Sequence, residues 1–459
     1  MAAPSRDRDR DLGPAAALAL AGRGHYTVTR IGPRTFQEGS AIWKALAVVS
    51  LLSILVATMY PIPTTAEASR LTPLWCLVCG SDGGVDVLLN VILFLPLAVG
   101  LRLSGISAGR VVVLSALLSL CVETIQFAGV PGRDASLSDL LTNTLGGTIG
   151  AVLAPLLPAG LFPTPRFARR SLAVWAGLWL TVTALSAWLM TPWIPDGAVW
   201  SRWAPNAPWL DPFHGQVTGV AMAGLRLPDG RLSDRAGQML QRALREERLA
   251  LSVQVVSGTL PDVRAWVYLI EARPLVLPMV RQEGTGLYFS IPTRSVQFRL
   301  RAPTLALPHG FPDRPGVPVL VNPSEEGRQL RATSTYDGVV RSSQVQLSPA
   351  QGWMLIAPFG LTLDRHEHLV TGLVLALFLL PLGYWAAHSM ATGRVLGILA
   401  GSLVLGLGLV PFWFGFPAVH WSQWVAALTG VAAGWALYRP AAYLETRCAS
   451  PSISEFSSS

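Results

Sequence analysis

Three pairs of polar side chains in the N-terminal half of the chain combine an acid with an amide. The pairs are Asp86 with Asn90, Glu123 with Gln126, and Asp139 with Asn143. Positions three or four apart share one face of a helix, so each pair can point between neighbouring helices. Carboxylates accept hydrogen bonds and amides both donate and accept, so such a cluster can hold an amine, a cation or a hydroxyl-rich group. The loop residue Arg133 lies just before the third pair and can meet phosphate or carboxylate bidentately.

The chain around these pairs is strongly apolar. Of its 459 residues, 51% are hydrophobic and only 14% are charged, and the mean hydropathy is +0.44. Because soluble domains carry about 25% charged residues, this composition excludes an ordinary cytosolic enzyme and predicts a polytopic α-helical membrane protein. About eight segments can cross roughly 30 Å of hydrocarbon as helices. They run over 41–60, 86–102, 110–128, 136–158, 170–191, 367–388, 394–414 and 421–438.

The distribution of positive charge predicts an orientation. Lys44 is the only lysine, so arginine supplies nearly all of the positive charge behind the formal net charge of +8. With the N-terminus in the cytoplasm, the short outer loops carry only Arg70 and Arg133, as the positive-inside rule requires. Both termini are then cytoplasmic, and the three acid–amide pairs lie toward the outer surface. The arginines are spread between apolar segments and form no basic face, which argues against nucleic-acid binding.

A long insert between the fifth and sixth apolar segments has an alternating hydrophobic pattern. Strands are predicted at 249–256, 265–270, 286–291, 295–300, 317–321, 329–336, 339–347 and 352–358. Asp337-Gly338 between two of them is a hairpin signal. Many short strands predict an extracytoplasmic all-β sandwich of the jelly-roll type.

The chain therefore divides into five expected parts. They are a disordered cytoplasmic tail (1–40), a membrane domain of five helices (41–191), the β-sandwich (192–366), a membrane segment of three helices (367–438) and a cytoplasmic tail (439–459). The last three membrane helices hold almost no ionisable residues, which favours an anchoring role for them. His366 and His368, on either side of Glu367, are interpreted as an interfacial anchor.

Other chemical motifs are weak. Cys76 and Cys79 favour a local disulfide or two free thiols over a redox motif, because a zinc site would need two more ligands. We expect no metal and no cofactor. The chain has no Walker loop, nucleophile elbow or His-Glu-x-x-His, so ATP-driven transport and standard hydrolase chemistry are unsupported.

The order and spacing of the polar residues resemble those of the VanZ-like family. The matching positions are Asp86, Asn90, Phe94, Pro96, Gly100, Ser119, Glu123, Gln126, Arg133, Asp139, Asn143, Gly146 and Gly150. One departure is Ala98, because the family pattern has Leu-Gly directly after the proline. The family consists of bacterial cell-envelope membrane proteins and is named for low-level resistance to the glycopeptide teicoplanin. The resemblance therefore implies a cellular location and a connection with glycopeptide resistance, but no particular reaction.

The insert is similar to the concanavalin-like, laminin-G-type jelly rolls found fused to VanZ-like proteins. Gln282-Glu283-Gly284 and Thr335-Tyr336-Asp337-Gly338 carry this similarity. Such domains bind glycans through aromatic stacking and polar loops, and others mediate protein contacts or act as scaffolds.

These features predict a bacterial inner-membrane protein whose outer polar cluster binds a cell-wall or lipid-linked glycan component. Its expected partners are membrane lipid and that glycan. One alternative is an enzyme that acts on an envelope lipid or glycan, with two carboxylates as acid and base or as a clamp for a divalent ion. A second alternative is a structural scaffold for envelope assembly.

Overall fold

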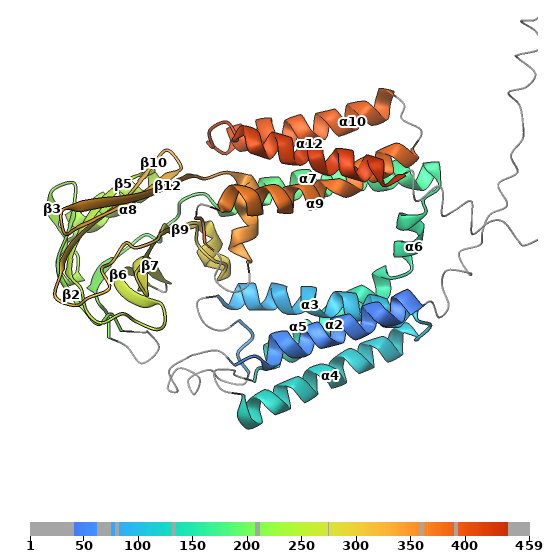
Figure 1. The fold of residues 1–459 in the computed structure, drawn as a ribbon, viewed down its shortest axis with the longest axis horizontal. Coiled ribbons are helices and arrows are strands. Elements are labelled where there is room, and N and C mark those ends of the chain that lie inside the picture. The colour runs from blue at the N-terminus through green and yellow to red at the C-terminus, as the bar shows by residue number, and fades with distance from the viewer. Residues whose placement is uncertain are drawn as a thin grey trace, which may run out of the picture.

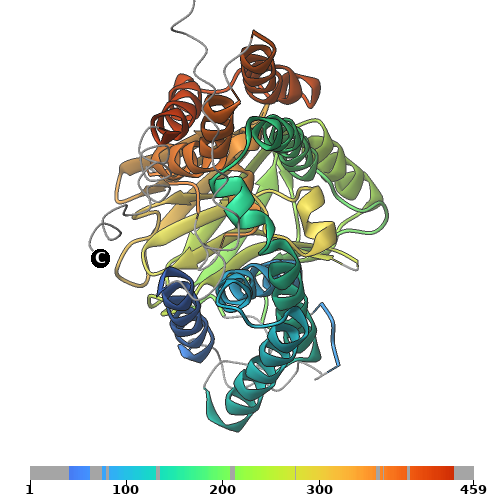
Figure 2. The same ribbon diagram turned by 90° about the vertical axis from the view of Figure 1, so that its right-hand side faces the viewer.

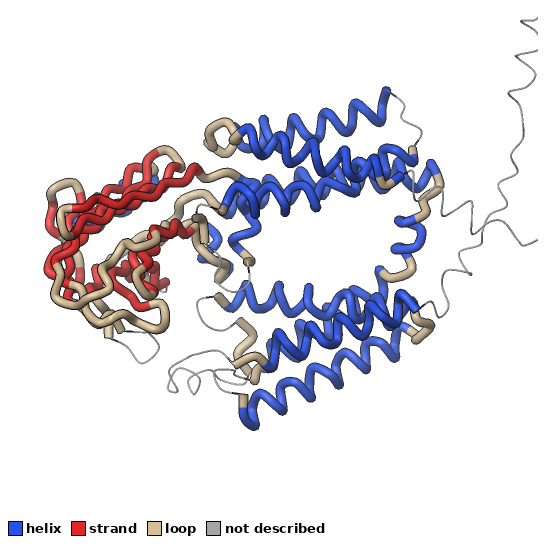
Figure 3. The backbone as a smooth tube through the Cα atoms, viewed as in Figure 1, coloured by secondary structure: helices blue, strands red, loops and turns tan. Residues whose placement is uncertain are grey.

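The structure is a computed structural model. Its strands gather at one end of the molecule, and most of its helices lie beside them (Figure 3). It describes residues 41–61, 75–78, 82–130, 135–206, 212–273, 275–357, 362–364, 366–389 and 393–438. The predicted tails and Arg133 lie outside the described residues.

The first helix group is built from the N-terminal apolar segments. Its members are α2 (Ala41–Met59), α3 (Gly83–Leu103), α4 (Ala108–Gly129) and α5 (Leu137–Leu153). Ser136 caps α5, since its Oγ accepts a hydrogen bond from the backbone N–H of Asp139 at 3.0 Å. A short helix, α6 (Leu156–Leu161), leads from this group to the second (Figure 1).

The second helix group comes from both sides of the insert. It consists of α7 (Pro165–Leu189), α9 (Glu367–His388), α10 (Gly393–Val404), the π-helical turn η5 (Leu405–Leu409), α11 (Val410–Trp413) and α12 (Trp421–Ala436). Trp175 of α7 donates to the carbonyl of Phe378 at 2.8 Å, and Trp179 donates to that of Ser402 at 3.1 Å. Seen from the end opposite the strands, the two helix groups lie on either side of α6 (Figure 2).

Six helices of the described chain are long and apolar enough to cross a membrane. They are α2, α3, α4, α7, α9 and the continuous stretch Gly393–Trp413. The remaining two predicted segments are also helical, but α5 has 17 residues and α12 has 16. Of the roughly eight spans that the sequence predicts, six therefore form helices that are long and apolar enough to cross a membrane.

Between α7 and α9 the chain forms two antiparallel six-stranded sheets. The strands are β1 (Trp200–Trp203), β2 (Gln216–Met222), β3 (Leu225–Arg226), β4 (Gly230–Arg231), β5 (Arg248–Val256), β6 (Ala265–Ala272), β7 (Leu275–Glu283), β8 (Gly286–Ser290), β9 (Thr304–Leu307), β10 (Pro318–Glu326), β11 (Gln329–Tyr336) and β12 (Val339–Gln346). One sheet has the order β4-β1-β6-β7-β8-β9, and the other has the order β12-β11-β10-β5-β2-β3. Tyr268 and Phe289 of the first sheet share one buried core with Val253 and Val321 of the second, as in a β-sandwich.

The hairpin predicted at Asp337-Gly338 is confirmed. Tyr336 pairs with Val339 across it, and both turn residues have positive φ (52° and 72°). Asparagine, aspartate and glycine tolerate this conformation, which explains why the dipeptide marks the turn.

Two predicted strands are wrong. Residues 295–300 lie mostly in the 3₁₀ helix η2 (Arg294–Phe298), which Arg299 ends with a φ of 52°. Residues 352–358 lie mostly in η3 (Pro349–Leu355), where a capping box between Ser348 and Gln351 favours a helical turn. The β domain is also not all-β, because α8 (Asp234–Arg245) packs Leu240 and Leu244 into its core.

The β domain contacts one end of both helix groups, which we call the β-proximal end. In the first turn of α3, the backbone N–H of Gly84 donates to the carbonyl of Arg299 at 3.1 Å. In the second group, Gln423 of α12 donates to Ser348 Oγ at 2.8 Å. Trp353 of η3 donates to Thr371 of α9 at 3.0 Å.

Glycine allows close approach of α3 and α5. A Cβ on Gly146 would overlap the carbonyl oxygen of Val91, and one on Gly150 would lie 2.8 Å from the Cβ of Ala98. Ala98 is fully buried, so the residue that departs from the family pattern still provides the small side chain that this contact requires.

We expect Gly146→Ala to destabilise the helix group by about 1–3 kcal/mol, because the helices must separate to admit the methyl group. Thermal unfolding of the purified protein in detergent measures the effect. Gly177→Ala in α7 is the matched control, because a Cβ there meets nothing within 4 Å and alanine favours the helix. Equal unfolding midpoints for the two variants would contradict the close approach.

Candidate functional site

The three acid–amide pairs lie at the β-proximal end of the first helix group. The first and third pairs begin in the opening turns of α3 and α5, and the second pair lies in the last turns of α4. The β domain is directly adjacent, since Arg301 forms an ion pair with Asp82, the residue before α3, at 3.4 Å. The three pairs therefore lie at the same end of this helix group.

Asn90 and Asp139 form the most direct link between two of the predicted pairs. Asn90 Nδ2 donates to Asp139 Oδ1 at 2.8 Å and so connects α3 to α5. Because the acceptor is a carboxylate oxygen, this hydrogen bond belongs to the stronger class. It also fixes the orientation of the Asp139 carboxylate between the two helices.

Asn143 connects α5 to α4 one turn further along. Its Nδ2 donates to Ser119 Oγ at 3.0 Å, and both residues are buried, with 2% and 0% of their surface exposed. Its Oδ1 has no hydrogen-bond partner among the described residues. A buried amide oxygen in that state is a strong acceptor for a donor that enters the site.

Glu123 acts on the start of α5. Its Oε2 accepts a hydrogen bond from the backbone N–H of Ser136 at 2.8 Å, while the side chain is 7% exposed. Ser136 in turn caps Asp139. The Glu123 carboxylate and the backbone N–H of Asp139 thus both bond to Ser136 at one helix cap, while Asn90 holds the Asp139 carboxylate.

Gln126 faces a helix that the sequence did not connect to this cluster. Its Nε2 donates to the carbonyl of Thr58 near the end of α2 at 2.9 Å, and its buried Oε1 has no partner among the described residues. The cluster therefore draws on four helices, with Thr58 and Ser119 as members that the acid–amide spacing did not reveal.

The remaining predicted site residues are arranged differently. Asp86 is exposed at the start of α3, and Arg133 lies outside the described residues. Cys76 forms a disulfide, and Cys79 lies outside the described residues. Ser138 Oγ donates to the carbonyl of Leu77 at 2.6 Å, so the start of α5 is also tied to the segment that carries Cys76.

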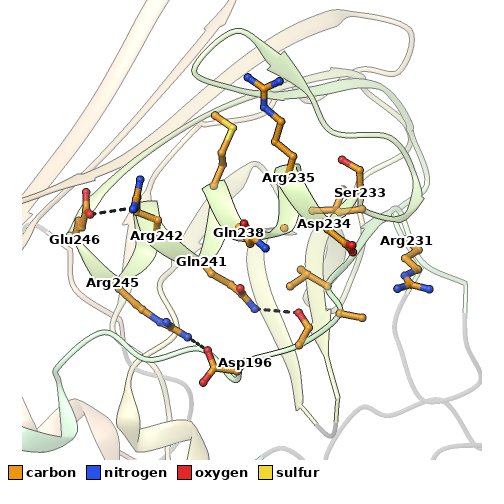
Figure 4. A pocket seen from close by; sticks show the side chains of 16 residues that line it. Asp196, Arg231, Ser233, Asp234, Arg235, Gln238, Gln241, Arg242, Arg245 and Glu246 are labelled. Atoms are coloured by element: carbon orange, nitrogen blue, oxygen red, sulfur yellow. Dashed lines mark hydrogen bonds and ion pairs between the residues drawn. The ribbon is translucent and has the colours of Figure 1, made fainter.

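A separate hollow of about 820 Å³ lies along α8 on the β domain (Figure 4). Its charges are largely paired with one another: Arg245 pairs with Asp196, and Arg242 pairs with Glu246 at 3.5 Å. Four arginines and three acids are among the residues that line it, so the hollow has no consistent charge that would select one class of ligand.

Comparison with known proteins supports the resemblance seen in the polar motif. Residues 33–158 match the family model described as VanZ/LLP1. No curated protein and no solved structure matches the chain. The match spans α2 to α5, which contribute all the described members of the polar cluster. Residues 33–158 are therefore a VanZ-like domain of the VanZ/LLP1 family, set within a multi-pass membrane protein.

Proposed function

We propose that the VanZ-like domain binds a glycan-containing component of the bacterial cell envelope, either cell wall or a lipid-linked precursor, at its β-proximal polar cluster. The observation that carries the proposal is the fixed pair of carboxylates, Glu123 and Asp139, beside the buried, unpartnered amide oxygen of Asn143. These groups accept hydrogen bonds, and the hydroxyl groups of a sugar donate them.

The positions proposed for the two domains agree with this role. By the positive-inside rule, both termini are in the cytoplasm and the β domain is extracytoplasmic. The resemblance to VanZ-like proteins implies that the membrane is the bacterial inner membrane. The polar cluster then faces the cell wall. A concanavalin-like or laminin-G-like β domain beside it would add a second glycan-binding surface, and loss of the cluster would alter tolerance to teicoplanin.

Complementation of a deletion strain tests the proposal. We expect Glu123→Ala and Asp139→Ala to lose teicoplanin tolerance almost completely, and Glu123→Gln and Asp139→Asn to retain part of it. A hydrogen bond to a carboxylate contributes about 1.5–3 kcal/mol to binding, or roughly 10- to 150-fold in affinity. The amide of Gln or Asn can still accept a hydrogen bond and so retains part of this contribution. The exposed residues Asp313 and Glu326 of the β domain provide matched controls, Asp313→Asn and Glu326→Gln. Membrane levels of every variant are checked by blot.

The same series separates the alternatives. If the isosteric amides fail as completely as alanine at normal protein levels, the carboxylates act as acid and base and the domain is an enzyme. Full complementation by all four variants would make the cluster a structural link between helices. Asp86→Asn belongs in the series because Asp86 is the exposed acid of the cluster.

A further inference from the structure

A second polar cavity lies in the part of the membrane region that the sequence favours as a simple anchor. It has a volume of about 220 Å³ and lies at the β-proximal ends of α9 and α12, against the edge strand β12. Its polar lining includes Gln344, Gln346, Glu367, His368, His420 and Gln423. Three segments far apart in the sequence meet here.

Gln423, one of the residues that line the cavity, has a buried hydrogen-bonding atom without a partner among the described residues. The residue is 3% exposed, and its Nε2 donates to Ser348 Oγ at 2.8 Å. Its Oε1 has no partner among the described residues. If the amide were turned over, Nε2 would be the unpartnered atom instead. Either way, a buried polar atom without a partner is unfavourable by about 1–3 kcal/mol, and a ligand that hydrogen-bonds to it regains that energy.

Glu367 supplies a fixed carboxylate at the same place. It is 5% exposed, its Oε2 accepts from Gln351 Nε2 at 2.8 Å, and its Oε1 lies 2.8 Å from His368 Nδ1. Each carboxylate oxygen can accept a further hydrogen bond. The carboxylate is therefore held in position for a hydroxyl group.

Two stacked histidine rings and two glutamine side chains are among the residues that line the cavity. The rings of His368 and His420 stack with centroids 4.8 Å apart and planes at 18°. Gln344 and Gln346 are exposed on the outer side of β12 and offer both donors and acceptors. No arginine or lysine is among the described residues that line the cavity, so it offers no bidentate guanidinium or permanent positive charge to a phosphate or carboxylate.

We propose that this cavity binds a neutral, hydroxyl-rich group of the size of one sugar ring. A hydroxyl both donates and accepts, and so uses the amide N–H groups, the amide oxygens and the carboxylate together. An ammonium group would leave the amide donors unused. The cavity shares no residue with the polar cluster of the VanZ-like domain, so the proposal is independent of the function proposed there.

Binding of methyl β-D-glucopyranoside to the full-length protein tests the proposal. The protein is purified in a detergent without a sugar headgroup, and binding is followed by saturation-transfer NMR, with glucose 6-phosphate as the anionic comparison. A second arm uses nanodiscs with and without monoglucosyl diacylglycerol, which separates a lipid headgroup from a free glycan as the source of the sugar.

We expect saturable binding in at least one arm, about tenfold weaker in Gln423→Leu and severalfold weaker in Gln346→Ala. Because Gln346 is exposed, its alanine variant tests the site even if the buried substitution disturbs folding. Gln254→Ala, at an exposed glutamine on β5, should bind like the wild type. The proposal is overturned by no binding in either arm, by equal binding in all variants, or by tighter binding of glucose 6-phosphate.

Discussion

Replacing Arg328 by leucine is expected to destabilise the protein by about 3–5 kcal/mol, the typical effect of removing one partner from a buried ion pair. Arg328 is 3% exposed, and its Nη2 lies 2.7 Å from Glu247 Oε1. Burial lowers the pKa of Arg328, and the carboxylates of Glu247 and Glu325 oppose that change. Without the guanidinium, Glu247 and the buried Glu325 lose the positive charge that opposes the rise of their pKa values.

Arg328 also ties the β domain to the second helix group. Its Nη1 donates to the carbonyl of Met190 after α7 at 2.9 Å, and its Nη2 donates to that of Phe414 after α11 at 3.3 Å. The guanidinium carbon lies 4.5 Å from the centroid of the Phe416 ring. The substitution therefore weakens the junction between β domain and helices as well as the charge pair.

Thermal unfolding followed by tryptophan fluorescence measures this effect. The matched control is Arg331→Leu, because Arg331 is exposed and its Nη2 donates to Gln344 Oε1 at 3.0 Å on the surface of the sheet. We expect the midpoint of the Arg331 variant to stay close to that of the wild type. If both arginine variants unfold at the same temperature, Arg328 does not hold the junction.

Glu325→Gln is expected to remove a pH dependence of stability. The Glu325 side chain is 1% exposed, and neither carboxylate oxygen has a hydrogen-bond partner among the described residues. Burial, with a smaller contribution from the negative charge of Glu247, raises the pKa of Glu325 to about 8, against the lowering effect of Arg328. The folded protein therefore binds this proton more tightly than the unfolded chain does.

The sign of the effect follows from proton linkage. Between the unfolded pKa of 4.5 and the folded pKa of about 8, the folded state holds more protons, so stability falls as the pH rises. Below and above this window the contribution of Glu325 is constant. At about 1.4 kcal/mol per pKa unit, the free energy of unfolding falls by a few kcal/mol across the whole window.

The test is the unfolding midpoint from pH 5 to pH 9. Glu325→Gln should match the wild type near pH 5 and unfold at a higher temperature at pH 9, because the amide stays neutral. Glu326→Gln, exposed on the same strand, should keep the wild-type slope. Parallel curves for the wild type and Glu325→Gln would show that folding does not raise the pKa of Glu325 above its value in the unfolded chain.

The sequence predicts best where one local rule decides the structure. Long apolar runs give helices, and Asp337-Gly338 gives a hairpin because both residues tolerate positive φ. The strand β7 was not predicted because Pro278 interrupts its pattern, and the register between β6 and β7 shifts close to it. The helix α8 carried a readable signal: Ser233 as N-cap, then Ala236, Leu240 and Leu244 at helical spacing.

The polar sites show the limit of spacing rules more clearly. Each acid–amide pair lies on one helix, so its shared face follows from the sequence. The hydrogen bonds to Thr58 and Ser119 do not, because they depend on how the helices pack. Glu367 and Gln423 are likewise brought together only by the pairing of α9 with α12. Gly430 and Gly434, which approach the backbone of α9, are the small residues that would have indicated this pairing.

The position of the β domain within the chain has a consequence for synthesis. Trp175 of α7 bonds to Phe378, 203 residues later. At roughly 5–20 residues per second, α7 leaves the ribosome about 10–40 s before its partner α9 exists. During that interval the indole N–H of Trp175 lacks this acceptor. Slow translation of the β domain would lengthen this interval, and truncation before α9 would make it permanent.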